Sequence, residues 1–154
     1  LEHYDVVGVA GNRRRYFGQP AWHRPRFLKQ EGPKDDLLGS VFHATMDMPN
    51  ARRKMHALSR FGESSGAAQL LDGVFIAARG KTLVNHHVQF DVSLGFHFYD
   101  LDFCRSATQA GLRLGVWPIA ITHKSVGGYE SKGWREAYQK YLDKWGEQAP
   151  HPFE

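Results

Sequence analysis

Residues 70–78, LLDGVFIAA, form an apolar run that is interrupted after two residues by Asp72 and Gly73. A short apolar run without alternation is typical of a strand that is buried on both faces. An aspartate and a glycine lower the β-propensity of such a strand, so their presence requires a physical reason. Glycine inside a strand marks either close approach by a ligand or another backbone, or a β-bulge, and the sequence leaves both open.

Similar apolar runs lie on either side of this one, at residues 5–11 (DVVGVAG), 37–46 (LLGSVFHATM) and 113–122 (RLGVWPIAIT). We predict a strand in each. Pro118 lies inside the last run, which favours an edge position or a bulge, because proline donates no ladder hydrogen bond.

Two segments have the periodicity of helices, Tyr99–Ala110 and Ser131–Trp145, and the second has a broad aromatic face. Residues 12–34 show no period and are predicted to be a long loop. Residues 49–66 are polar, and their basic residues 52–54 fit either a short helix or a flexible loop. Strands alternating with helices predict an α/β fold, with a sheet covered by helices on both sides.

The composition excludes several classes of protein. A chain of 154 residues fits one domain, and 42% hydrophobic with 23% charged residues excludes a disordered chain. Apolar runs are too short for a membrane span, and the single cysteine, Cys104, cannot form an internal disulfide. We predict a core thiol there. The lone thiol and the lack of a signal-peptide pattern favour a cytoplasmic protein.

The formal net charge of +4 includes a cluster at Arg13–Arg15. A mild positive charge suits an anionic partner such as a nucleotide, and is equally compatible with a solvated face. The basic residues form no recognised nucleic-acid-binding motif, so we expect no nucleic-acid partner.

The first candidate site is FHFYDLDFCR (96–105), where Asp100 and Asp102 lie at the start of a predicted helix. Residues two apart there point in different directions, so one carboxylate can face a cleft while the other caps the helix or pairs with Arg105. A carboxylate among aromatic rings is partly desolvated, and its raised pKa suits a general base. Both aspartates are also compatible with simple capping.

The second candidate is His123, at the end of the apolar run 113–122 and before a glycine-containing loop. Ligands bind beyond the carboxyl ends of strands in open α/β sheets, and an imidazole there could ligate a metal or contact a phosphate. A surface histidine on a turn is an equally good interpretation.

Three segments in order carry a family resemblance: VVGVAG (6–11), LDGVFIAAR (71–79) and the long segment 90–128. The chain resembles glycosyltransferase family 2, within its branch that has an HFYDxDFC-type motif. The resemblance spans about residues 5–129 and implies a GT-A fold, a mixed sheet flanked by helices. It also implies an inverting, hexosyltransferase-type enzyme that moves a sugar from a UDP- or GDP-type nucleotide sugar to an acceptor hydroxyl.

The resemblance implies a role for each candidate residue. Asp100 would be the general base, although Tyr99 stands where many relatives have glutamate. Asp102 and Arg105 would hold the helix start and the acceptor side. Asp72 and Gly73 would lie near donor sugar and acceptor, and His123 would bind a Mn²⁺ or Mg²⁺ ion on the diphosphate.

The family's metal-binding Asp-x-Asp motif precedes the first strand, whereas only four residues precede Asp5 here. We therefore expect residues 1–154 to be one domain, the carboxyl-terminal, acceptor-side part of a GT-A domain that is incomplete at its N-terminus, with residues 146–154 frayed. An exposed sheet edge would allow a homo-oligomer. The alternative is a degenerate, non-catalytic GT-A-like module that binds carbohydrate or a protein.

Overall fold

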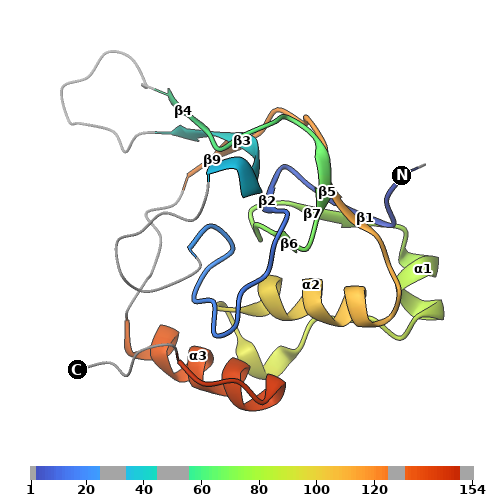
Figure 1. Ribbon diagram of the computed structural model, residues 1–154, viewed down its shortest axis with the longest axis vertical. Helices are drawn as coiled ribbons and strands as arrows, with labels where there is room; N and C mark the ends of the chain where they lie inside the picture. The colour runs from blue at the N-terminus through green and yellow to red at the C-terminus, as the bar shows by residue number, and fades with distance from the viewer. Residues whose placement is uncertain (1–2, 25–33, 45–55, 125–130, 150–154) are drawn as a thin grey trace.

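The computed structural model describes residues 3–24, 34–44, 56–124 and 131–149, and its strands form two sheets (Figure 1). The four-stranded sheet has the order β5-β8-β1-β7, in which β1 and β8 are parallel and the other pairs antiparallel. Its strands are β1 Val6–Gly8, β5 Gly66–Ala68, β7 Ile76–Ala78 and β8 Leu114–Val116. The five-stranded sheet has the order β4-β3-β2-β6, with β9 parallel to β3. Its strands are β2 Ala10–Asn12, β3 Leu37–Ala44, β4 His56–Arg60, β6 Leu70–Leu71 and β9 Thr122–His123.

Three of the four predicted strands are each divided between the two sheets. The run 5–11 becomes β1 and β2, 70–78 becomes β6 and β7, and 113–122 becomes β8 and the start of β9. β1 pairs with β7 and β2 with β6, so the first two runs bend together, at Val9 and at residues 72–75. The prediction of a single sheet is wrong, because the strands form two sheets. The residues stay apolar where the chain bends from one sheet into the other, so the sequence pattern does not reveal the bends. The coarser prediction, a mixed α/β fold, is confirmed.

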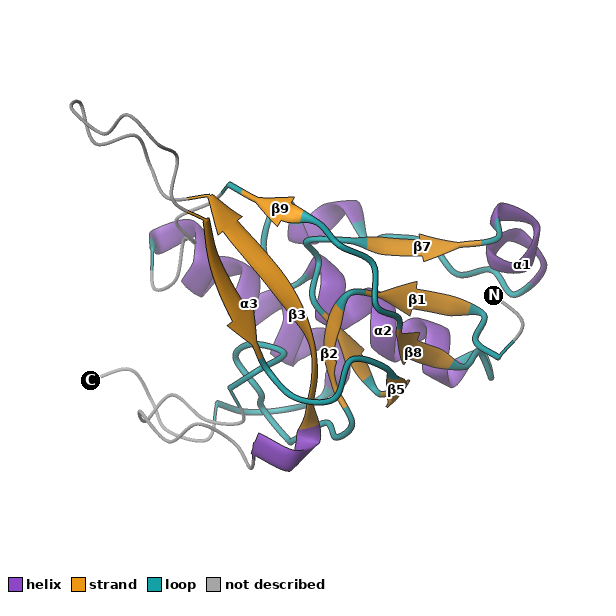
Figure 2. Cartoon of the chain, turned by 90° about the horizontal axis from the view of Figure 1, so that it is seen from above, coloured by secondary structure: helices purple, strands orange, loops and turns teal. Residues whose placement is uncertain are grey.

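The helices are α1 Gly80–Asn85, α2 Tyr99–Gln109 and α3 Lys132–Trp145, with short 3₁₀ turns at Lys34–Asp36 (η1) and Val92–Leu94 (η2). The predictions of α2 and α3 are confirmed; Ser131 caps α3 by accepting from the Trp134 N–H. Figures 1 and 2 show the three α-helices on one side of the sheets, not on both as expected. Within the described ranges, no helix is long and apolar enough to cross a membrane.

The predicted loops are only partly irregular. Of the loop predicted over residues 12–34, Asn12 ends β2 and Lys34 begins η1, while residues 13–24 consist of turns, bends and an isolated bridge between Ala21 and Arg24. The segment 49–66, by contrast, contains β4, which pairs with β3 from Ser40 to Ala44. Residues 52–54 lie outside the described residues.

Helix α2 packs against β6 and β8 and supplies a large part of the core. Cys104 is fully buried there, and its sulfur accepts a hydrogen bond of 3.2 Å from the Leu71 N–H. Burial raises the pKa of this thiol well above its usual range, so the prediction of a core thiol is confirmed.

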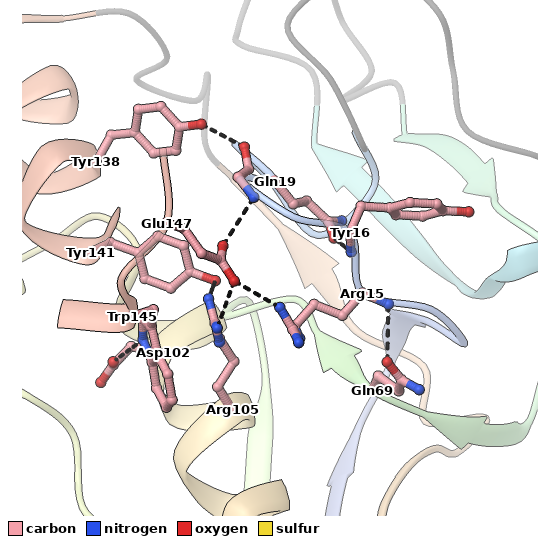
Figure 3. A network of polar contacts seen from close by, with 11 residues as sticks. Arg15, Tyr16, Gln19, Gln69, Asp102, Arg105, Tyr138, Tyr141, Trp145 and Glu147 are labelled. Carbon is pink, nitrogen blue, oxygen red and sulfur yellow. Dashed lines mark hydrogen bonds and ion pairs between the residues drawn. The ribbon is translucent and has the colours of Figure 1, made fainter. Parts of the chain in front are cut away.

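A buried ion-pair network joins α3 to α2 and to the loop after β2 (Figure 3). Glu147 accepts from Arg105 on α2 (2.7 Å), from Arg15 (3.0 Å) and from the Gly18 N–H (2.9 Å). Burial opposes ionisation of Glu147, but the Arg105 and Gly18 hydrogen bonds outweigh it and lower its pKa. Residues 146–154 were expected to fray. Residues 150–154 lie outside the described residues, but Glu147 accepts hydrogen bonds from three donors, and only 6% of its side chain is exposed.

Replacing Glu147 with glutamine tests this network. The substitution leaves the Arg105 guanidinium, 8% exposed, without its carboxylate partner. Loss of one member of a buried pair costs about 3–5 kcal/mol, so we expect a loss of about 3 kcal/mol in the free energy of unfolding, measured by urea denaturation. Glu63→Gln is the control: Glu63 pairs with Arg13 but is 77% exposed, so its loss should cost less than about 1 kcal/mol. Equal effects of the two substitutions would contradict the network's role.

Candidate functional site

The described residues line a cavity of about 540 Å³ between the five-stranded sheet, the turn that follows β6 and the N-terminus of α2. Ligand sites typically have volumes of about 300–1,000 Å³. Asp72, Gly73, Tyr99, Asp100 and His123 all line it. Five of the seven residues singled out from the sequence therefore meet at one cavity, although they come from three separate segments of the chain.

Asp100 is held at the start of α2 by two backbone donors. Its carboxylate accepts from the Leu101 N–H at 2.9 Å and from the Gly73 N–H at 3.1 Å. Burial, and after it the charge of Asp72, raise the pKa of Asp100 to about 6 against the opposing effect of these N–H groups. A carboxylate of this pKa is largely ionised at pH 7 and more basic than an exposed one, as a general base requires.

Asp72 follows β6, where the chain turns toward β7. Its carboxylate accepts from the Val74 N–H at 3.1 Å, and the Phe75 N–H approaches the Asp72 carbonyl at 3.4 Å. This is an aspartate-stabilised turn between two strands, so the bulge interpretation is wrong. Burial raises the pKa of Asp72, whereas the Val74 N–H and the nearby His123 and His43 lower it.

Gly73 is required by Tyr99, whose ring covers it. A Cβ at position 73 would lie 2.3 Å from the Tyr99 hydroxyl oxygen and 2.7 Å from the adjacent ring carbon. The same hydroxyl donates to the Gly73 carbonyl at 3.1 Å. The glycine thus marks the close approach of a side chain of this protein, which neither sequence interpretation considered.

Phe98 precedes α2 and has a left-handed backbone, with φ at +63°. This conformation is uncommon for a bulky residue. Three aromatic rings of α3 surround the Phe98 side chain, with ring centroids 5.0 to 5.4 Å away: Trp134, Tyr138 and Tyr141. Their packing holds Phe98 in this conformation at the N-cap position of α2.

Histidines contribute strongly to the cavity, which is lined by His23, His43, His97 and His123. Burial lowers the pKa of His23 to about 4 and that of His97 below its usual range. Only His123 was singled out from the sequence. His97 lies within the FHFYDLDFCR stretch but was assigned no role there. His23 and His43 come from segments without a motif, and no local signal indicates that the fold brings them to the cavity.

Asp102 and Arg105 lie outside the residues that line the cavity. Asp102 is fully buried and accepts from the Lys144 ammonium and the Trp145 indole, both at 2.9 Å. Arg105 donates to Glu147 and to the Tyr141 hydroxyl, and its guanidinium lies 4.0 Å from the Trp145 ring centroid. Both residues attach α3 to α2 (Figure 3), so Asp102 does not cap the helix.

No group of three or more His, Cys, Asp or Glu side chains in the described ranges is arranged to hold a metal ion. His123 offers one nitrogen ligand, and a metal requires further ligands. The described residues therefore do not form a complete metal site.

Gly73→Ala tests the contact with Tyr99. The added methyl group overlaps the Tyr99 hydroxyl, so we expect the free energy of unfolding to fall by about 1–3 kcal/mol. Adding Tyr99→Ala should make the cost of the alanine at 73 much smaller, because the clashing atoms are gone. Gly80→Ala is the control, since a Cβ there meets no atom within 4 Å. A cost at 73 that is independent of Tyr99 would contradict the contact.

Asp100→Asn tests the environment of the carboxyl group. The folded protein releases this proton near pH 6 and the unfolded chain near 3.8, so the folded state binds more protons between these values. The stability of wild type relative to Asp100→Asn should therefore fall by about 2 kcal/mol as the pH rises from 4 to 7. Urea denaturation across this range measures the difference, with the exposed Asp143→Asn as control. A difference that does not vary with pH would exclude the raised pKa.

Comparison with known proteins adds no relative: no protein-family model, no curated protein and no solved structure matches this chain. Its function must therefore be inferred from the residues that meet at the cavity.

Proposed function

We propose that the cavity is the acceptor side of an inverting glycosyltransferase site, in which Asp100 is the general base. The observation that carries the proposal is that Asp100 and His123 line the same cavity although 22 residues separate them in the sequence. The Asp100 carboxylate is suited to accept a proton, and the His123 imidazole is suited to contact a phosphate. A sugar joined to a diphosphate is a substrate that needs both.

The walls of the cavity support a carbohydrate ligand. Trp22, Phe61, Phe96 and Trp134 line it together with the charged and imidazole groups. A sugar ring presents an apolar C–H face and hydroxyl groups at its edge, so aromatic rings can cover the face while polar side chains bind the edge.

The reaction requires one proton acceptor from this chain. The acceptor hydroxyl attacks the anomeric carbon, its O–C bond forms, and its proton passes to the Asp100 carboxylate. The bond from the anomeric carbon to the phosphate oxygen breaks, and the diphosphate leaves with the electron pair. A single displacement inverts the anomeric centre, so no covalent enzyme intermediate is needed.

A divalent cation on the donor diphosphate would stabilise the charge of the leaving group, and His123 could supply one of its nitrogen ligands. The steps above depend only on this chain's own residues.

The alternative is a non-catalytic module that binds carbohydrate or a protein partner. The lack of a complete metal site among the described residues favours it. The two functions share the cavity and differ in whether Asp100 accepts a proton.

The substitution Asp100→Asn distinguishes the glycosyltransferase from the non-catalytic module. Transfer or hydrolysis of UDP- and GDP-sugars is followed in the presence of Mn²⁺, and sugar binding is measured alongside. Loss of a general base should lower the rate by about 10²–10⁴-fold while binding persists. Asp143→Asn, at an exposed position on α3, should react like wild type. Unchanged transfer by Asp100→Asn would refute the proposed role, and binding without any transfer by wild type would favour the non-catalytic module.

A further inference from the structure

His43 and His123 form a pair across two adjacent strands. β3 and β9 are parallel, and the two histidines are directly paired in their register. Their ring centroids lie 6.1 Å apart, with an angle of 53° between the ring planes. Both side chains are partly buried, and both line the cavity that contains Asp100.

The strand register fixes the direction of this pair. Phe42 and Thr122 are the preceding residues on the two strands and are also paired, and both are exposed. Since successive side chains on a strand point to opposite faces, one pair faces solvent and the next faces the cavity. Two imidazoles are thus presented to the cavity by regular backbone.

We propose that His43 acts together with His123 as a two-imidazole clamp on the phosphate groups of the leaving diphosphate. The inference rests on the proposed function, which assigned a role to His123 alone. Each imidazole carries an N–H donor, and at this separation both can donate to oxygens of one phosphate group or of two linked ones. Donors that converge from two strands hold the leaving group in a fixed position without reorganisation.

Asp72 belongs to the same cluster, because His123 and His43 both lower the pKa of its carboxyl. A bare carboxylate would repel a phosphate. Here the Val74 N–H and the Trp22 side chain hydrogen-bond to Asp72 and compensate part of its negative charge. Within the cluster of His43, His123 and Asp72, the two imidazoles are therefore the groups suited to bind an anion.

The cluster also connects the two ends of the proposed reaction. Asp72 interacts electrostatically with Asp100 as well as with both histidines. Asp100 and the two histidines thus all lie close enough to Asp72 to influence or be influenced by its charge, and all four residues line one cavity.

Inorganic pyrophosphate tests the clamp directly. The chain is titrated with pyrophosphate in EDTA, so that no metal ion bridges ligand and protein, and binding is measured by calorimetry. We expect His43→Gln and His123→Gln each to weaken binding about tenfold, as for loss of a hydrogen bond to a charged group. His3→Gln, at an exposed position, should bind like wild type.

A second measurement follows the histidine rings of the wild-type protein. The ring-proton NMR signals of His43 and His123, assigned with the two glutamine variants, should both shift in wild type as pyrophosphate is added. Absence of binding, or wild-type affinity in His43→Gln, would overturn the clamp. Pyrophosphate carries no sugar, so the result does not depend on transfer. If the clamp is confirmed but Asp100→Asn still transfers sugar, only the role of Asp100 as general base is refuted. If His43→Gln binds pyrophosphate normally and transfer still depends on Asp100, only the clamp is refuted.

Discussion

The hydrogen bond from the Gly73 N–H to the Asp100 carboxylate connects the parts on which the cavity depends. Gly73 lies in the bend where one apolar run passes between the two sheets, and Asp100 lies in the first turn of α2. Tyr99 adds a second connection by donating to the Gly73 carbonyl. The bend and the helix therefore position each other. A larger residue at 73 would separate them, because the Tyr99 ring occupies the space that a side chain would need.

The first turns of α2 contribute to the cavity on one face and to the contact with α3 on the other. Asp100 faces the cavity, where burial keeps its pKa near neutrality. Asp102 and Arg105 face α3 and hold it through Lys144, Trp145 and Glu147. The FHFYDLDFCR stretch thus lines the cavity through Asp100 and attaches α3 through Asp102 and Arg105. The division follows from helical geometry, since residues two apart point in different directions.

The sequence predicted α2 and α3, because helical periodicity is a local property. The family resemblance also implied that Asp72, Asp100 and His123 lie around one substrate, and all three line the same cavity. The sequence did not predict the second sheet, because a buried strand that bends between two sheets stays apolar throughout. It also missed His43, which reaches the cavity only through pairing of β3 with β9, strands about 80 residues apart in the sequence. Long-range register of this kind leaves no local pattern.

Phe98 gives the molecule one further property. Its left-handed backbone costs about 1–3 kcal/mol, and the rings of α3 supply the packing that retains it. If α3 were to detach, that residue would be free to relax and the first turn of α2 would reorient. Because Phe98 and Trp134 both line the cavity, a ligand bound there would also stabilise α3 against local unfolding, although most of that helix lies outside the cavity.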